Sequence, residues 1–515
     1  MHNPEKVKYI KLATILLIAI SVRLPGIFWG VQTGDEPPFI NYHPDEPHIV
    51  SMAEEFINGV TNRAEYYPKG FPFQIGLVSS LISPLTEVDN EAVIIAGRML
   101  SLFYGVMTVL IIYLLSRELF PDPRTALISA LFLGLSGIHV TQSHFSTVDA
   151  GNTFWFYTTA FCCLLYFRRG KGIYLLLAVI SSACALAFKL SWFSILPVLY
   201  VLIRLKKGVR HYLLFLFGIS IIFIMANGGR YTLDNFSLTL NNVLHDNISI
   251  IKKHNKYLNP FVYLLELISG LGFPVFLLSV YGAVRFFTRG TGLKDFLKGE
   301  IFALITAPVL LYFISISFLD IPFSRQILPV VPAVVLVAAY GFTEITESKL
   351  FRRRNVNYVF FFSILFYQLI YVGAGEYYFV SDTREKAGVW IKNNIPTSQE
   401  VTSTPYVIIP YLNKQYKTVE TFESPYIILH EAYYYRFVRS CLNPCKGYPE
   451  WEEIYHAPYE HFQNIQRLFK GDLHYRLVKK FEVKAVTPEM AFYKRFWGTY
   501  PQFIGDLLIY KKVDA

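Results

Sequence analysis

Charged residues are scarce in this chain, and their scarcity argues against a soluble protein. Asp, Glu, Lys and Arg make up 17% of the 515 residues, whereas soluble domains average about 25%. Cysteine is also sparse, with five residues. Cys162, Cys163 and Cys184 lie in apolar segments, where we expect them to fill the core. The first apolar run, residues 9–30, is too long for the core of a signal peptide and has no small-residue cleavage site, so we expect no cleavable leader.

Long apolar runs are what the chain has instead. They recur over the first 375 positions, and runs of about 17–25 residues can cross a hydrocarbon core about 30 Å thick. The sequence therefore predicts a mainly α-helical, polytopic membrane protein with about eleven spans. The run 71–85 contains Pro72 and Pro84 and is too short for a span, so we expect an interfacial or re-entrant helix there. The expected spans are 9–29, 92–116, 125–142, 150–167, 173–188, 190–203, 212–227, 262–284, 301–319, 326–343 and 357–376.

Positive charge gives the orientation of these spans. With the N-terminus in the cytoplasm, the inner segments hold 20 Lys and Arg in 50 residues, and the outer segments hold 8 in 91. Cytoplasmic loops of membrane proteins carry an excess of Lys and Arg. We therefore expect the outer loops 30–91 and 228–261 and everything after residue 379 to be extracytoplasmic. The net charge of +10 belongs to this topology signal and does not indicate nucleic-acid binding.

The last part of the chain, 380–515, differs in character. An amphipathic helical pattern over 384–394 is followed by strand-like stretches, which predict a small α/β domain outside the membrane. Its many Tyr and Phe residues fit a core and a face resting on the bilayer, or a surface that stacks on carbohydrate. Cys441 and Cys445 could form a disulfide, remain free thiols or hold a metal. The sequons at Asn235 and Asn247, in the loop 228–261, matter only if the host glycosylates them.

Ionisable residues gather at one predicted depth, the outer ends of the spans. Charges in or near spans are costly and are functional candidates by default. Each also has a simpler explanation: Asp45, between Pro44 and Pro47, or Asp149 can cap a helix, and Lys69 can be an interfacial lysine. A shared depth is unexpected for unrelated structural ion pairs and favours one site. The set is Arg23, Asp45, Glu46, Lys69, Arg98, Asp149, Lys189, Glu266 and Arg325.

One reaction could use these groups together. Transfer of a sugar from a lipid-linked phosphate needs a carboxylate base to take the proton of the acceptor hydroxyl. It also needs cations that hold the departing phosphate. The leaving group is already anionic and needs little help from an acid.

The sequence resembles the GT-C superfamily of integral-membrane glycosyltransferases, and within it the protein-mannosyltransferase/ArnT-like family, over roughly residues 1–380. The resemblance lies in the order and spacing of "SVRLPGIFWG", "HPDEPHIV", "YYPKGFPFQIGL", "HVTQSHFSTVDAGNTFWF", "ALAFKLSWFSILPVL" and "SRQILPVVPAVVLVAAYG". The tail opening "DTREKAGVWIKNNIP" is also similar. The stretch after Lys69 departs from the family, since it reads Gly-Phe-Pro where the family often has successive prolines. A β-trefoil insertion, as in the eukaryotic protein mannosyltransferases, is absent from the sequence.

The resemblance implies a polyprenyl- or dolichyl-phosphate-sugar donor and inverting transfer to a hydroxyl of a glycan, lipid or protein on the outer face. It implies that Asp45 is the general base, that Glu46 supports it, and that Asp149 is a second acidic group. Lys69 would hold the lipid phosphate, with Lys189 and Arg325 as further phosphate-binding candidates. It implies no certain cofactor; a divalent metal, if used, would lie at Asp45 and Glu46. The nearby His43, His48, His139 and His144 could assist or be structural.

Two other functions remain open from the residues alone. A secondary transporter should show paired half-structures and charges near the membrane midplane, and neither is visible in the sequence. A non-catalytic scaffold or envelope-glycan assembly factor would explain the tail domain but not the acidic loop. We therefore predict a hexosyl- or pentosyltransferase in the cell membrane, with residues 1–379 as its transmembrane module.

Overall fold

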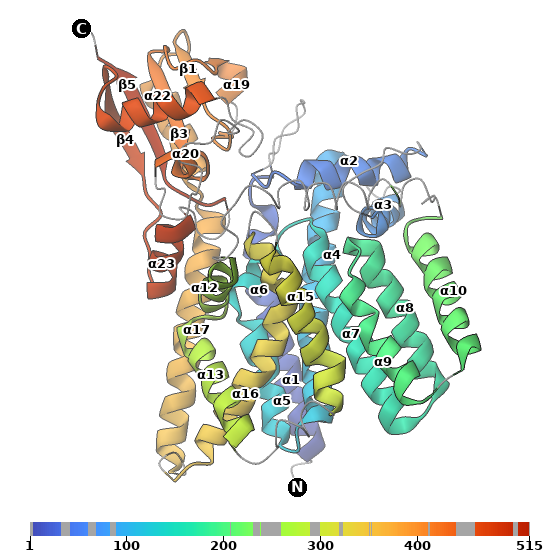
Figure 1. Cartoon of the computed structure of the whole chain (residues 1–515). Helices are drawn as coiled ribbons and strands as arrows, with labels where there is room; N and C mark the ends of the chain where they lie inside the picture. The colour runs from blue at the N-terminus through green and yellow to red at the C-terminus, as the bar shows by residue number, and fades with distance from the viewer. Residues whose placement is uncertain are drawn as a thin grey trace. The chain divides into compact units, whose positions relative to one another are not determined.

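A computed structural model describes residues 4–31, 42–59, 68–82, 89–206, 208–229, 237, 259–288, 299–318, 323–349, 351, 353–409, 412–438, 459–497 and 503–513. Within this part the chain forms two compact units (Figure 1). The first comprises 1–28 and 44–373, and the second comprises 29–43 and 374–515. The sequons Asn235 and Asn247 and the cysteines Cys441 and Cys445 lie outside the described residues.

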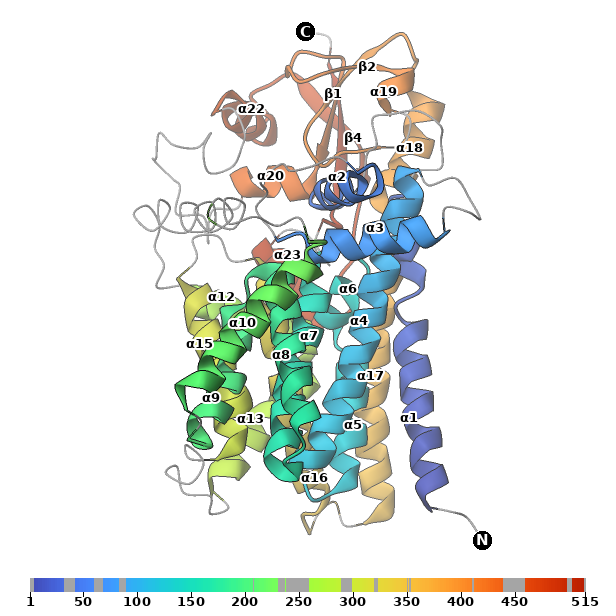
Figure 2. The same ribbon diagram turned by 90° about the vertical axis from the view of Figure 1, so that its right-hand side faces the viewer.

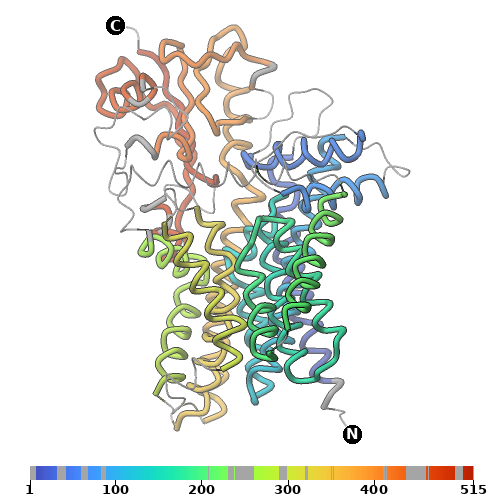
Figure 3. Tube along the Cα trace, turned by 45° about the vertical axis from the view of Figure 1, so that its right-hand side comes forward, coloured from blue at the N-terminus to red at the C-terminus, as the bar shows by residue number. Residues whose placement is uncertain are grey.

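The first unit is helical throughout, and its helices follow the apolar runs. Helix α7 runs alongside both α4 and α8 (Figure 3). Its elements are α1 (Pro4–Ser21), η1 (Pro25–Phe28), α2 (Glu46–Ile57), α3 (Gly70–Ile82), α4 (Asn90–Leu119), α5 (Pro123–Gly134), α6 (Gly137–Gln142), α7 (Val148–Arg169), α8 (Gly172–Lys189), η2 (Trp192–Ser194), α9 (Leu196–Arg204), α10 (Val209–Ala226), α12 (Asn259–Leu271), α13 (Phe273–Thr288), η5 (Phe302–Thr306), α15 (Ala307–Ser317), η6 (Ser324–Val330), α16 (Val331–Thr346) and most of α17 (Arg354–Val380).

Six helices of the described chain are long and apolar enough to cross a membrane, or seven if one bent pair counts as a span. Each of the eleven expected runs is nevertheless helical, so the predicted class is confirmed, and the number of crossings stays a prediction. The run 125–142 is not one continuous helix, because α5 ends at Gly134 and α6 begins at Gly137. Local signals fix several ends: Asp89 accepts the Ala92 N–H at the start of α4, and Gly170 ends α7 in the left-handed conformation.

The run 262–284 is bent, which the hydropathy pattern does not reveal. Helices α12 and α13 meet at an angle of 116°. The residue between them, Gly272, has φ +83°, a conformation that costs little only for glycine. A Cβ there would lie 2.5 Å from Oε1 of Gln368, and Nε2 of Gln368 donates to the Leu271 carbonyl at 2.6 Å. The bend is thus specified by glycine and stabilised by a buried amide.

Two helices of the first unit lie across one end of the upright helices. They are α2 and α3, which follow the acidic loop and the Lys69 stretch (Figures 1 and 2). The expected interfacial helix over 71–85 corresponds to α3, a short apolar helix of 13 residues. Its buried face includes Phe71, Pro72 and Ile75. Because α2 and α3 cap the bundle, they bring Asp45, Glu46 and Lys69 to its end.

The second unit is a small α/β fold. Its five strands pair in the order β2-β1-β3-β5-β4. Strand β1 is parallel to β2 and β3, whereas β5 is antiparallel to β3 and β4. The buried residues of β3 and β5 give it a core of its own. The elements are α18 (Thr383–Asn394), β1 (Glu400–Ser403), α19 (Leu412–Gln415), β2 (Lys417–Val419), β3 (Tyr426–His430), α20 (Glu431–Val438), α22 (Tyr459–Lys470), β4 (Tyr475–Phe481), α23 (Pro488–Trp497) and β5 (Leu507–Lys512).

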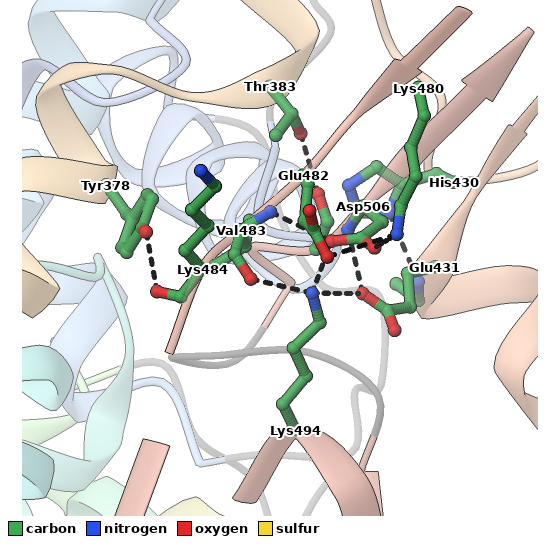
Figure 4. Close-up of polar contacts among 12 residues, drawn as sticks. Tyr378, Thr383, His430, Glu431, Lys480, Glu482, Val483, Lys484, Lys494 and Asp506 are labelled. Carbon is green, nitrogen blue, oxygen red and sulfur yellow. Dashed lines mark hydrogen bonds and ion pairs between the residues drawn. The ribbon is translucent and has the colours of Figure 1, made fainter. Parts of the chain in front are cut away.

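A buried polar cluster ties α23 to the sheet of this unit. The Lys494 ammonium points toward the Asp506 carboxylate and donates to the Val483 carbonyl at 2.7 Å (Figure 4). Asp506 also accepts the Val483 N–H at 2.8 Å, and its own N–H donates to Glu431 at 2.8 Å. Opposite charges and backbone groups satisfy one another here, so the cluster is structural.

Candidate functional site

Asp45 lies immediately before α2 but does not cap it. Its backbone is helical, with φ −86° and ψ −20°, and its side chain makes no capping hydrogen bond. The carboxylate instead forms an ion pair with Arg325 of η6. The Asp45 side chain is 33% exposed, far more than the other two predicted carboxylates. Helix capping therefore does not account for Asp45, and the group remains reachable.

Arg325 is held in place by its neighbours in η6. Its guanidinium lies over the ring of Phe323, 5.1 Å from the ring centroid. The next residue, Gln326, accepts the Phe323 N–H at 2.8 Å and the Tyr263 hydroxyl on its side chain. The backbone carbonyl of Gln326 accepts the Tyr312 hydroxyl at 2.6 Å. Helices α12 and α15 thus fix the segment that presents Arg325 to Asp45.

Glu46 has a different environment from its neighbour. It is completely buried and accepts two hydrogen bonds from Arg98, at 2.9 and 2.8 Å. It also accepts the Ser146 N–H at 2.6 Å. Arg98, equally buried, donates to the Ile27 carbonyl at 2.6 Å. This pair joins α2, α4, η1 and the segment before α7, which makes it a fixed point beneath Asp45.

Asp149 and Lys189 form a second ion pair. Asp149 lies in the first turn of α7 and Lys189 in the last turn of α8. Both positions suit the helix dipole, which favours an acid at the N-terminus and a base at the C-terminus. Lys189 retains 22% exposure and Asp149 only 5%. Solvent therefore reaches the Lys189 side chain but hardly the Asp149 side chain.

Lys69 pairs with Glu55 of α2 at 2.7 Å. The next residue, Gly70, explains the departure from successive prolines. A Cβ at Gly70 would lie 2.6 Å from the Ala187 carbonyl oxygen, so this position has no room for a side chain. The same close approach places the start of α3 beside the end of α8. Lys69 and Lys189 therefore belong to one corner of the first unit.

The remaining members of the predicted set have other surroundings. Arg23 is completely buried and donates to the carbonyls of Ala19 and Gly134 at 2.7 and 3.0 Å. His144 is also buried, and burial together with Arg23 and Arg98 lowers its pKa to about 3, which makes it a weak base. Glu266 is buried, and its carboxylate has no partner among the described residues. None of the three is presented to solvent with Asp45.

Three contributors were not singled out as site residues from the sequence. The sequence marks Arg98 only as a charge at the common depth, whereas Glu55 and Gln326 carry no local signal. Glu55 lies in the last turn of α2, in an ordinary "AEEF" helical pattern. Partner choice for such residues depends on how helices pack, which a single sequence does not display.

The sequence predicts that a divalent metal, if the protein uses one, lies at Asp45 and Glu46. Both carboxylate oxygens of Glu46 accept hydrogen bonds from Arg98, and Asp45 pairs with Arg325. Within the described ranges, moreover, no group of three or more His, Cys, Asp or Glu side chains is placed to hold a metal ion. The carboxylates of Asp45 and Glu46 are therefore already paired with Arg325 and Arg98.

Part of the chain is similar to known proteins. Residues 75–218 match the family model of dolichyl-phosphate-mannose-protein mannosyltransferase. An uncharacterised protein of Aquifex aeolicus is 24% identical over 340 residues, which are 64% of this chain and 63% of that protein. The chain thus spans less than two thirds of this relative's length.

Solved structures extend the comparison to the fold. The apo oligosaccharyltransferase of Archaeoglobus fulgidus covers 98% of this chain and 88% of its own, with a TM-score of 0.51 and 12% identity. ArnT from Cupriavidus metallidurans bound to undecaprenyl phosphate covers 84% and 94%, with a TM-score of 0.49 and 12% identity. The resemblance predicted from the sequence is confirmed: the chain is an integral membrane protein with the fold of GT-C glycosyltransferases, similar over residues 75–218 to the protein mannosyltransferases.

Proposed function

We propose that this protein transfers a sugar from a polyprenyl- or dolichyl-phosphate donor to an acceptor hydroxyl of a glycan, lipid or protein, with inversion. The observation that carries the proposal is the Asp45–Arg325 pair at the capped end of the first unit. A reachable carboxylate beside a cation is what this reaction needs. The family match over residues 75–218 supports the same class of donor.

Asp45 is assigned the general base. As the acceptor oxygen attacks the anomeric carbon, its proton passes to the Asp45 carboxylate. The bond between that carbon and the phosphate oxygen breaks, and its electron pair leaves with the lipid phosphate. Exposure supports the choice: the side chain of Asp45 is 33% exposed, against 0% for Glu46 and 5% for Asp149. An acceptor can reach Asp45 and cannot reach Glu46.

The phosphate is assigned to Lys69, Lys189 and Arg325. Each is paired with a carboxylate in the structure, namely Glu55, Asp149 and Asp45. A phosphate brings several strong acceptor oxygens and competes well for such cations. Asp149 then orients the sugar or the acceptor from its place beside Lys189. Glu46 supports Asp45 by fixing the first turn of α2 to Arg98.

The orientation is part of the proposal. The bias of Lys and Arg supports a cytoplasmic N-terminus and an extracytoplasmic domain from residue 380 onward. The site then lies at the outer face, where the donor enters from the bilayer and the acceptor from the aqueous side. A cysteine introduced into an exposed position of α22 should react with an impermeant thiol reagent added outside intact cells. Labelling only after the membrane is opened contradicts this orientation.

The test of function is transfer of labelled sugar by the purified protein from a polyprenyl-phosphate donor. Asp45→Asn should lower kcat about 100- to 10,000-fold, the usual contribution of a general base. Asp122→Asn is the matched control, since Asp122 also precedes a helix and accepts the Arg124 N–H as a cap. If Asp45→Asn is no slower than Asp122→Asn, Asp45 is not the base. If the wild-type protein transfers no sugar from any such donor, the transferase proposal fails.

A further inference from the structure

The turn that follows α8 has a strained backbone. Leu190, directly after the last residue of α8, has φ +47° and ψ +41°. This left-handed conformation is routine only for glycine, and the chain uses glycine for it at the end of α7, where Gly170 has φ +66°. Strain of this kind persists only where the surrounding structure holds it, and it clusters at functional sites. The leucine therefore needs an explanation beyond the ending of a helix.

Hydrogen bonds hold the turn on both sides of Leu190. Its N–H donates to the Leu186 carbonyl at 2.9 Å, and its own carbonyl accepts the Trp192 N–H at 2.8 Å. The Ser194 hydroxyl donates to the Ser191 carbonyl at 2.7 Å. These bonds fix the turn to the end of α8 before it and to η2 after it.

Two side-chain contacts join the same turn to the beginning of α7. Lys189 forms the ion pair with Asp149, and the Ser191 hydroxyl donates to the side-chain oxygen of Asn152. Asp149 and Asn152 are three positions apart in α7 and so lie on one face of that helix. In a continuous helix, residues two positions apart such as Lys189 and Ser191 would not face the same side. The left-handed Leu190 is therefore what lets both of them reach α7.

The two contacts differ in burial. Asn152 is 1% exposed and Ser191 is 3% exposed, whereas the Lys189 side chain keeps 22% of its exposure. A lysine ammonium sits on a flexible four-carbon stem, so its position is set by its backbone and by the carboxylate that it pairs with. The buried contact lies two residues from Lys189 and about one helical turn from Asp149, and it therefore fixes the backbone on both sides of the ion pair.

We propose that Asn152 and Ser191 are positioning residues for Lys189. They act through the backbones of α7 and of the turn, and they do not themselves touch the donor. The inference rests on the proposed function, in which Lys189 holds the lipid phosphate. A positioned ammonium can form charge-assisted hydrogen bonds with a phosphate without first losing the freedom of a mobile side chain. Loss of the Asn152–Ser191 contact should therefore weaken donor binding more than it slows the chemical step.

Steady-state kinetics of the full-length protein test this role. Ser191→Ala should raise the KM for the polyprenyl-phosphate-sugar donor of the transfer assay about three- to tenfold, with little change in kcat. Ser116→Ala is the matched control, because it also removes one buried hydroxyl, which lies 3.2 Å from the Ser129 hydroxyl in the same unit. A purely structural loss of folded protein would lower kcat and leave the KM unchanged. A donor KM for Ser191→Ala equal to that for Ser116→Ala overturns the inference.

A double-mutant cycle shows whether Ser191 acts through Lys189. Lys189→Ala alone should raise the donor KM about 10- to 100-fold, and adding Ser191→Ala to it should raise the KM no further. An equal increase from Ser191→Ala in both backgrounds contradicts the positioning role.

The reactivity of the Lys189 amine gives a readout that does not depend on transfer. The purified protein is treated with a trace of an acylating reagent, and mass spectrometry measures acylation of Lys189 relative to the exposed Lys392. Ser191→Ala should raise this ratio several-fold, because a less fixed ammonium spends more time away from Asp149, and Ser116→Ala should not. Equal ratios overturn the positioning role. Failure of the wild-type protein to transfer sugar would sink the proposed function alone, since the labelling result stands without it.

Discussion

Loss of the Glu46 charge should destabilise the protein strongly, because its partner would remain buried and charged. Glu46 and Arg98 are completely shielded from solvent. Glu46→Gln preserves the shape of the side chain but removes the negative charge between two Arg98 nitrogens and the Ser146 N–H. One oxygen acceptor becomes an amide donor that faces a guanidinium. The single change isolates electrostatics from packing.

The magnitude follows from the pair's burial. Removing one partner of a buried ion pair costs about 3–5 kcal/mol, because the other charge is left uncompensated. For a chain of this size the midpoint of thermal unfolding should fall on the order of 5–10 °C. Glu46→Gln combined with Arg98→Met should recover part of the loss, since no lone charge remains. Recovery should be incomplete, because the Ile27 carbonyl loses its Arg98 donor.

The assay is thermal unfolding of the detergent-solubilised protein at a fixed scan rate, followed by tryptophan fluorescence. Glu347→Gln is the control, since Glu347 pairs with Arg124 in the same unit but both side chains are at least half exposed. Exposed pairs contribute about 0–1 kcal/mol, so this variant should melt almost with the wild type. If Glu46→Gln melts no lower than Glu347→Gln, the pair does not anchor α2 and the reasoning about its support of Asp45 is wrong.

Three further outcomes are expected. Gly272→Ala should lower the thermal midpoint by several degrees, because alanine is strained at φ +83° and its Cβ meets Gln368. Gly373→Ala is the control and should leave the midpoint unchanged, because a Cβ at Gly373 has open space around it. The pKa of His430 is lowered to about 3, by burial first and then by Arg384, so the stability that it contributes is complete above about pH 6.5 and is lost as the pH falls toward 3. Between pH 6.5 and 5 this loss is on the order of 2 kcal/mol, and a melting series should show it in the wild type and much less in His430→Gln. Lys69→Ala should raise the donor KM about 10- to 100-fold, and an unchanged KM would remove Lys69 from the phosphate site.

The fold class was predictable because long apolar runs can be recognised in the sequence itself. In a bilayer the backbone polar groups of such a run must be hydrogen-bonded internally, as they are in a helix. The eleven apolar runs all became helices, and the short run 71–85 became α3. The break at Gly272 was not predicted, because glycine alone does not end an apolar helix. The break also requires the left-handed backbone of Gly272 and a hydrogen bond from Gln368, which lies nearly 100 positions later in the sequence.

The sequence named the acids and bases of the candidate site but not their ion-pair partners, and their roles in a reaction stay predictions. The predicted topology puts the acids and bases at one depth, and the structure pairs Lys69 with Glu55, Lys189 with Asp149, and Arg325 with Asp45. The sequence did not show that Glu46 is enclosed by Arg98, whereas Asp45 remains reachable. Two adjacent carboxylates thus have opposite environments, because the backbone turn at the start of α2 sends their side chains in different directions. Such a difference depends on tertiary packing.

The pairing of Arg325 with Asp45 has a kinetic consequence under the proposed function. While the ion pair holds, the carboxylate is occupied and cannot accept a proton efficiently from an incoming hydroxyl. An anionic donor headgroup that draws Arg325 away releases it. Under this mechanism, proton transfer from the acceptor becomes efficient only after the donor has bound. Under the proposed function, binding of the donor phosphate would therefore control when Asp45 can act as the base.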